Sequence, residues 1–256
     1  RMQSPYALGN DALYRRWRAW KLENYPVRTE SVVVEVRDPR NLSPTEAQEL
    51  LRICRKANMA IYRSRLGDEA DPAAVPATAP GVALPPASMP SPDAALPPPS
   101  LESKDIPRRF GAHFGLHRLD SNLLADEDSI TSIEAVPAKS GRGYIPYSNC
   151  RLLWHTDGYY NPETRRIRAF LLHCVRPATE GGENALLDPE IAYIRLRDAD
   201  PDYVRALMAP DAMTIPPNTE EGAERPASVG PVFSVDSAGG NLHMRYTART
   251  RSIVWK

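Results

Sequence analysis

The chain has 256 residues, of which 42% are hydrophobic and 25% charged, as in a typical globular protein. Its 32 basic residues balance its 32 acidic residues, which argues against nucleic acid as a partner. No apolar run approaches the roughly 18 residues that a membrane span needs, so we expect no membrane partner. The three cysteines, Cys54, Cys150 and Cys174, lie far apart and form no CxxC pair, which predicts a reducing, cytoplasmic location.

Helix and strand signals alternate in residues 1–65, so we expect an N-terminal α/β segment there. Residues 11–20 have apolar side chains at helical spacing, and the valine-rich residues 31–36 are typical of a strand. A Ser-Pro-Thr-Glu capping box at residues 43–46 opens a second helix. The two helices are expected to bury these side chains: Leu13, Trp17, Trp20, Ala47, Leu50, Leu51, Cys54 and Met59.

Residues 66–104 differ in composition from the rest of the chain. Ten of the 26 prolines lie between residues 71 and 100, together with many alanines. Proline removes a backbone donor and fixes φ, so neither a helix nor a sheet runs easily through such a segment. We predict a disordered, polyproline-like insert rather than a ligand for a proline-recognition domain.

Residues 105–256 are expected to form a strand-rich core. Two short helices are predicted behind Asp188 and Asp200, because each aspartate precedes a proline at the first helical position. Short strands separated by turn residues are typical of a barrel or sandwich. The expected strands are 130–136, 151–155, 166–174, 184–187, 231–235, 241–247 and 251–255. Because the chain stops one residue after the last of them, we expect this core to be truncated at its C-terminus.

The pair His155 and Asp157 carries the clearest chemical signal in the sequence. On a strand, residues two apart point to the same face about 7 Å apart, so an imidazole and a carboxylate there can reach one metal ion. One histidine and one carboxylate are two of the three ligands of the facial triad that binds Fe(II) and leaves positions open for oxygen. The alternative is a surface histidine beside a turn aspartate, because the His-x-Asp pattern is common.

The surrounding motifs resemble those of the taurine dioxygenase (TauD/TfdA-like) family of Fe(II)- and 2-oxoglutarate-dependent dioxygenases. The resemblance is carried by WHTDGYYN at 154–161, LLHC at 171–174, EGGEN at 180–184 and LLD at 186–188. It implies an α+β or mainly β fold: a distorted double-stranded β-helix, jelly-roll or cupin-like, with flanking helices. Residues 105–256 would be its catalytic core, and residues 1–65 would belong to the same catalytic domain.

The resemblance also implies roles for single residues. His155 and Asp157 would be catalytic residues and iron ligands. Asn184 occupies the place where the family has a hydroxyl residue that helps to bind 2-oxoglutarate, which departs from the pattern. Arg151 stands where the family often has a substrate contact, and a cation there would suit an anionic substrate. The alternative for Arg151 is a solvated residue at a strand end.

The third iron ligand is not evident from the sequence. His113 and His117 precede the motif and are expected to be structural, and His173 is expected to be a core histidine. His243 follows the motif but falls in a segment that, in the family, precedes the distal histidine. We expect the distal histidine and the arginine that binds 2-oxoglutarate to lie beyond Lys256. Arg245, Arg249 and Arg251 could bind 2-oxoglutarate only if His243 were the ligand.

These features together predict a dioxygenase that uses Fe(II), 2-oxoglutarate and O2 to hydroxylate a small, anionic organic substrate, with release of succinate and CO2. The alternative is a non-catalytic or incomplete β-helix domain that lacks the third metal ligand. A metal-dependent hydrolase ranks last, because the sequence contains no HExxH motif. The identity of the substrate and the oligomeric state, a homo-oligomer included, stay open.

Overall fold

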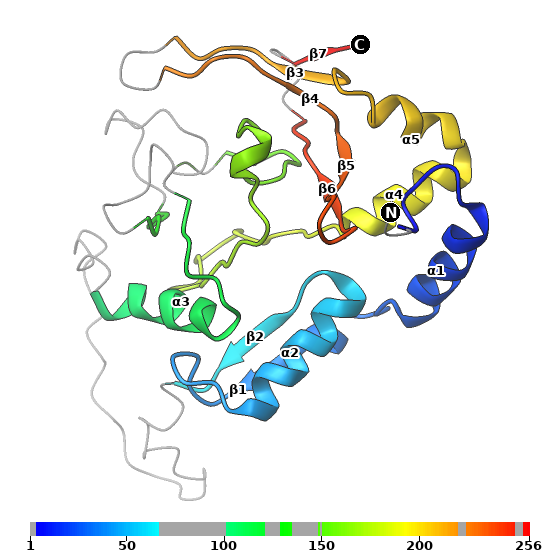
Figure 1. The fold of residues 1–256 in the computed structure, drawn as a ribbon. Coiled ribbons are helices and arrows are strands. Elements are labelled where there is room, and N and C mark those ends of the chain that lie inside the picture. Colours follow the sequence, from blue (N-terminus) through cyan, green and yellow to red (C-terminus); the bar gives the residue numbers. More distant parts are fainter. Residues whose placement is uncertain are drawn as a thin grey trace, which may run out of the picture.

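The computed structural model describes residues 4–66, 101–120, 129–134, 148, 150–219, 224–248 and 253–256. The elements in chain order are α1 (Asp11–Asn24), β1 (Val33–Val36), α2 (Pro44–Ala57), β2 (Ile61–Ser64), α3 (Leu101–His113), α4 (Pro189–Ala199), α5 (Pro201–Leu207), β3 (Met213–Ile215), β4 (Ser228–Gly230), β5 (Phe233–Val235), β6 (Leu242–Met244) and β7 (Val254–Trp255). Figure 1 shows α1 beside α4, the pair β1 and β2 next to α2, and the later strands on the opposite side.

The two helices and the strand predicted within residues 1–65 are present, with one strand more. β1 and β2 pair in parallel, and α2 crosses between them. The capping box is confirmed, because the Ser43 hydroxyl accepts from the Glu46 backbone N–H while the Glu46 carboxylate accepts from the Ser43 N–H at 2.7 Å. Leu50 and Ile53 of α2 are buried against the valines of β1, but Leu51 is 41% exposed, contrary to expectation. β2 was not predicted.

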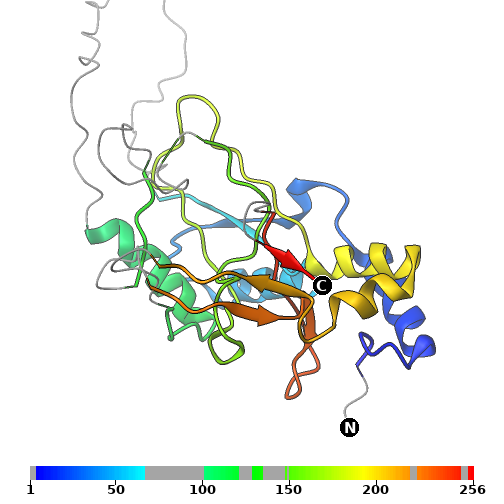
Figure 2. The same cartoon turned by 90° about the horizontal axis from the view of Figure 1, so that it is seen from above.

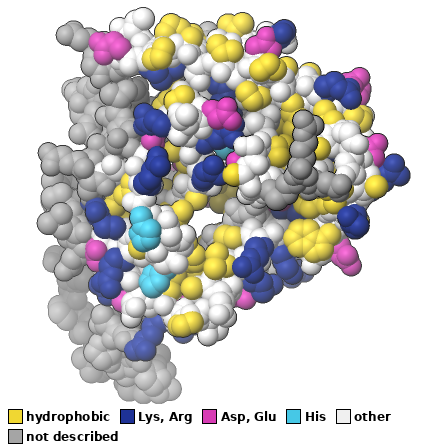
Figure 3. Space-filling view, in the orientation of Figure 1, with side chains coloured by type: hydrophobic (Ala, Val, Ile, Leu, Met, Phe, Trp, Pro, Cys, Tyr) yellow, Lys and Arg dark blue, Asp and Glu magenta, His cyan; other side chains and the backbone are white. Residues whose placement is uncertain are grey.

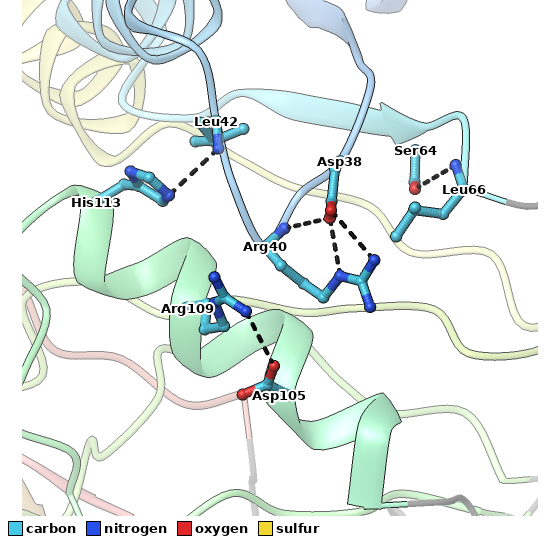
Figure 4. Close-up of polar contacts among 8 residues, drawn as sticks. All are labelled: Asp38, Arg40, Leu42, Ser64, Leu66, Asp105, Arg109 and His113. Atoms are coloured by element: carbon cyan, nitrogen blue, oxygen red, sulfur yellow. Dashed lines mark hydrogen bonds and ion pairs between the residues drawn. The ribbon is translucent and has the colours of Figure 1, made fainter.

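α3 begins within the stretch expected to be an insert. Its first turn, from Leu101, precedes the predicted insert boundary at residue 104, and the rest of that insert, 67–100, lies outside the described residues. Phe110 of α3 stacks on Tyr62 of β2, with ring centroids 4.4 Å apart. At the end of the same helix, His113 Nε2 accepts a hydrogen bond from the Leu42 N–H at 3.2 Å (Figure 4). α3 is therefore packed onto the N-terminal segment.

The C-terminal part consists of two helices and small antiparallel sheets. Asp188 and Asp200 cap α4 and α5 as predicted. One sheet has the order β4-β3-β7, and β5 pairs with β6 as a second sheet. β5, β6 and β7 lie within three of the predicted strands. No regular strand forms in the other predicted segments, which are 151–155, 166–174, 184–187 and the described part of 130–136, residues 130–134. These extended segments lack the continuous ladder of backbone hydrogen bonds that defines a strand.

The described residues form a mixed α+β structure. Within them the helices contain more residues than the short strands. A second apolar core joins the start of the chain to its end, with Tyr6 and Tyr14 packed against Tyr193 of α4 and Phe233 of β5. Both views show α1, α4 and α5 side by side (Figures 1 and 2). Residues 6 and 14 at the start of the chain thus share this second core with α4 and the C-terminal strands.

A buried ion cluster fastens α1 to α4. The Lys21 ammonium, fully buried, lies 2.6 Å from the Asp188 carboxylate and 2.5 Å from that of Glu190, and both contacts are ion pairs without hydrogen-bond geometry. Asn58 donates to Asp188 at 2.9 Å, and Tyr6 donates to Glu190. Burial raises the pKa of Asp188, an effect that Lys21 and Asn58 oppose. The predicted apolar face of α1 is corrected accordingly: Lys21 is buried, and Trp20 is 44% exposed.

We predict that Lys21→Met lowers the free energy of unfolding by about 3–5 kcal/mol, because it leaves two carboxylates in a buried site without their cation. Arg18→Met is the matched control, since Arg18 also lies on α1 and pairs with Asp198 of α4, but at the surface. Arg18→Met should lower the free energy of unfolding by less than about 1 kcal/mol. Urea unfolding of both variants measures the difference, and equal losses would show that burial does not distinguish the two ion pairs.

Candidate metal centre

The segment that contains His155 is held by backbone pairing with residues 246–248. The Thr156 N–H donates to the Tyr246 carbonyl at 2.9 Å, and the Ala248 N–H donates to the Trp154 carbonyl at 2.8 Å. His155 is therefore directly opposite Thr247 in a short antiparallel bridge. This pairing gives residues 154–156 the extended conformation in which alternate side chains share one face.

The side chains of His155 and Asp157 turn toward each other, as their spacing predicts. His155 Nε2 lies 3.7 Å from Asp157 Oδ1, and the two side chains are 29% and 48% exposed. His155 Nδ1 lies 2.8 Å from the Leu153 carbonyl oxygen. A carbonyl can only accept, so Nδ1 donates to it, and Nε2 is the ring nitrogen that faces Asp157.

This donor pair fits one divalent metal ion. Nitrogen and oxygen ligands lie about 2.0–2.2 Å from such an ion, so two of them can be at most about 4 Å apart. The separation of 3.7 Å between Nε2 and Oδ1 falls within that limit and exceeds a hydrogen-bond distance. The Leu153 carbonyl orients the ring through its other nitrogen, as the outer partners of metal-binding histidines generally do. His155 and Asp157 would thus supply two ligands.

A tight turn follows Asp157 and is anchored from the inside. Gly158 has φ +61°, a left-handed conformation that other residues adopt at a cost. The Asn161 N–H donates to the Gly158 carbonyl at 2.8 Å, and the buried Asn161 amide donates to Asp120 at 3.1 Å and to the Arg165 carbonyl at 3.0 Å. Sequence analysis did not single out Asn161, whose only signal was its position three residues after the glycine.

In the described part of the chain, the two other predicted site residues lie apart from this pair. Asn184 is exposed, and its amide donates to the Gly182 carbonyl at 3.2 Å within its own loop. Arg151 is exposed at the start of the extended segment that leads to His155. Their roles in binding 2-oxoglutarate and substrate stay predictions.

The remaining histidines lie in other surroundings. His113 binds the backbone of Leu42, and His117 is exposed. His173 is half-buried and hydrogen-bonded through Nδ1 to the Tyr62 hydroxyl at 2.7 Å, and burial lowers its pKa. His243 lies on β6, where burial and the nearby Arg166 and Arg168 lower its pKa to about 4.

A third metal ligand is not found in the described part of the chain. No group of three or more His, Cys, Asp and Glu side chains there is arranged to hold a metal ion. His243 is therefore not brought together with His155 and Asp157, and the structure gives no support to it as the third ligand.

Arg245 has a structural role. Sequence analysis allowed it to bind 2-oxoglutarate only if His243 were an iron ligand. Its guanidinium is buried and donates to the backbone carbonyls of Met213, Gly230 and Pro231, and more weakly to that of Tyr159 at 3.4 Å. Desolvation lowers the pKa of Arg245. These carbonyls occupy the group that would have bound a carboxylate. Arg249 and Arg251 lie outside the described residues.

Comparison with known proteins places the chain in a family. Residues 99–255 match the model of the taurine catabolism dioxygenase TauD, TfdA family. The chain belongs to the TauD/TfdA family. The family match begins two residues before α3, so it includes His155, Asp157 and the pairing segment 246–248, while α1, α2, β1 and β2 precede it.

Two curated relatives carry the same name, uridine-5'-phosphate dioxygenase. The protein from Amycolatopsis sp is 39% identical over 99 residues, which cover 37% of this chain and 33% of that protein. The protein from Streptomyces sp is 32% identical over 134 residues, which cover 52% of this chain and 47% of the relative. The matches thus span about a third to a half of the relatives' lengths. No solved structure matches the chain. No helix in the described residues is long and apolar enough to cross a membrane.

We predict that Gly158→Ala destabilises the protein by about 1–3 kcal/mol or more, because alanine is strained at positive φ. An added Cβ would also lie 2.6 Å from Ile167 Cγ1 and 2.8 Å from Asn161 Nδ2. Gly115→Ala is the control, since Gly115 has φ +74° and nothing within 4 Å of its added Cβ. The thermal midpoint should fall further for Gly158→Ala than for Gly115→Ala. Equal decreases would mean that the close packing behind the turn does not contribute to the destabilisation.

Proposed function

We propose that the protein is a Fe(II)- and 2-oxoglutarate-dependent dioxygenase, with His155 and Asp157 as two of its iron ligands. The observation that carries the proposal is the pair of donor atoms 3.7 Å apart, one of which has its proton fixed on the far ring nitrogen by the Leu153 carbonyl. Membership of the TauD/TfdA family supports the same chemistry. The short antiparallel sheets would then be part of a double-stranded β-helix, which is the fold expected for the family.

Each residue near the pair has a defined task in this proposal. The Leu153 carbonyl keeps the proton on Nδ1, so that His155 is a neutral ligand. The Asp157 carboxylate contributes one negative charge, and the turn at Gly158 carries the chain away from the site. When bound, Fe(II) and 2-oxoglutarate supply the oxidation of a substrate C–H bond by O2, which yields the alcohol, succinate and CO2. Asn184 is proposed to contact 2-oxoglutarate through its amide.

We further propose that the substrate is a small phosphate ester, of the nucleoside monophosphate class. The two curated relatives are named for such a compound, uridine-5'-phosphate. Lys and Arg side chains gather around a hollow in the middle of one face of the molecule (Figure 3), and they would favour an anion. Arg151, exposed four residues before His155, is the proposed substrate contact, since a guanidinium can bind a phosphate through two hydrogen bonds.

A second candidate function has one observation in its favour. Because the described residues contain no group of three metal-binding side chains, the chain could be a family member with an incomplete metal site and no turnover. Iron binding separates the two candidates: a dioxygenase binds Fe(II) and consumes 2-oxoglutarate, and an incomplete site does neither.

We predict that Asp157→Ala lowers succinate formation from 2-oxoglutarate to the level of an enzyme-free control, because it removes one of the proposed iron ligands. Asp202→Ala is the control, since that carboxylate lies on the surface of α5 and pairs locally with Arg205. The assay supplies Fe(II), ascorbate and O2, and compares uridine 5'-phosphate with uridine.

Succinate formation that depends on the phosphate ester and on Asp157 supports the proposal. Full turnover in Asp157→Ala would overturn the ligand assignment. Equal turnover with uridine and its phosphate would overturn the proposed substrate class and leave the dioxygenase assignment intact.

A further inference from the structure

Thr156, between the two proposed ligands, binds one residue of the facing segment through both its backbone and its side chain. Its N–H donates to the Tyr246 carbonyl at 2.9 Å. Its hydroxyl oxygen accepts from the Tyr246 N–H at 3.1 Å and lies 3.5 Å from the same carbonyl, to which it donates. Thr156 therefore engages both backbone polar groups of a residue 90 positions away in the sequence.

The hydroxyl replaces a bond that a regular sheet would make. In an antiparallel ladder, Thr156 and Tyr246 form a hydrogen-bonded pair in which each N–H donates to the other residue's carbonyl. Here the Tyr246 N–H goes to the Thr156 hydroxyl instead. The ladder therefore ends at this residue, and the backbone is released to turn at Asp157 and Gly158.

The side chains on either side of Thr156 point to the opposite face of the extended segment, because successive residues alternate. The orientation of the main chain at Thr156 therefore sets the directions of both His155 and Asp157. Threonine suits this place, since its branched Cβ restricts χ1 and holds the hydroxyl toward Tyr246. Valine has the same shape but would leave the Tyr246 N–H without this partner.

We propose that Thr156 is a positioning residue of the metal centre, whose hydroxyl fixes the main chain between His155 and Asp157 so that their donor atoms converge. This inference rests on the proposed function, because it assumes that these two side chains bind a metal ion. In this role Thr156 does not itself contact substrate or cofactor.

Titration of the protein with Co(II), followed by visible absorption, tests the proposal without relying on turnover. We expect Thr156→Val to bind Co(II) about 10- to 100-fold more weakly than the unmodified protein, as is typical when an outer partner of a metal ligand is lost. Thr156→Ser should restore most of the affinity, because it keeps the hydroxyl. Thr214→Val is the control, since it removes a half-buried hydroxyl from β3 of another sheet and should leave Co(II) affinity unchanged.

The thermal midpoint, measured on the same samples, shows whether each variant is folded at the titration temperature. Loss of Co(II) affinity in a folded Thr156→Val variant, with recovery in Thr156→Ser, supports the proposal. Unchanged affinity in Thr156→Val, or equal loss in the valine and serine variants, overturns it. Should Thr156→Val fail to fold, Thr156→Ala takes its place, and equal Co(II) affinity in the alanine and serine variants would likewise overturn the proposal.

Asp157→Ala distinguishes failure of this inference from failure of the proposed function. If Asp157→Ala binds Co(II) as well as the unmodified protein, the metal assignment is wrong and the role of Thr156 falls with it. If Asp157→Ala loses Co(II) while Thr156→Val keeps it, only the positioning role is wrong.

Discussion

The backbone pairing between residues 154–156 and 246–248 is the interaction on which the candidate centre depends. The two segments are about 90 positions apart, so the bonds between them close a long loop that contains α4, α5 and β3 to β6. Closing a loop of that length costs conformational entropy, although the cost rises only slowly with length. The pairing keeps His155 in an extended segment, with Asp157 on the same side.

Packing around this pairing supports it from several directions. Arg245, one residue before Tyr246, ties the carbonyls of β3 and β4 to the turn beyond Asp157. A buried arginine is retained only when its donors are satisfied, and here backbone carbonyls satisfy them. The Lys21 cluster, in turn, fastens the N-terminal helix to α4. The region matched by the family is thus continuous in packing with the elements that precede it.

Local signals in the sequence were sufficient for part of this structure. The two-residue spacing of His155 and Asp157 predicted a shared face, and the Asp-Pro pairs predicted the starts of α4 and α5. These features depend on neighbours a few residues away. They therefore follow from the periodicity of the chain and from capping chemistry, which any single sequence displays.

Long-range contacts explain what the sequence did not reveal. Lys21 was overlooked because a lysine is rarely buried without partners, and its partners lie on α4. α3 was hidden by Pro107 within it and by the proline-rich stretch before it. Residues 166–174 are rich in apolar side chains, as strands often are, but form no ladder. The Thr156 hydroxyl gains its partner only once residue 246 is beside it. Such outcomes depend on which segments meet, and that information is not local.

The central claim is that His155 and Asp157 bind the same metal ion, and anomalous scattering from crystals soaked in Mn(II) tests it most directly. The expected result is a manganese peak about 2.0–2.2 Å from both His155 Nε2 and an Asp157 carboxylate oxygen, with Nδ1 still facing the Leu153 carbonyl. A manganese peak elsewhere in the molecule, or one that contacts only one of these two side chains, would contradict the account.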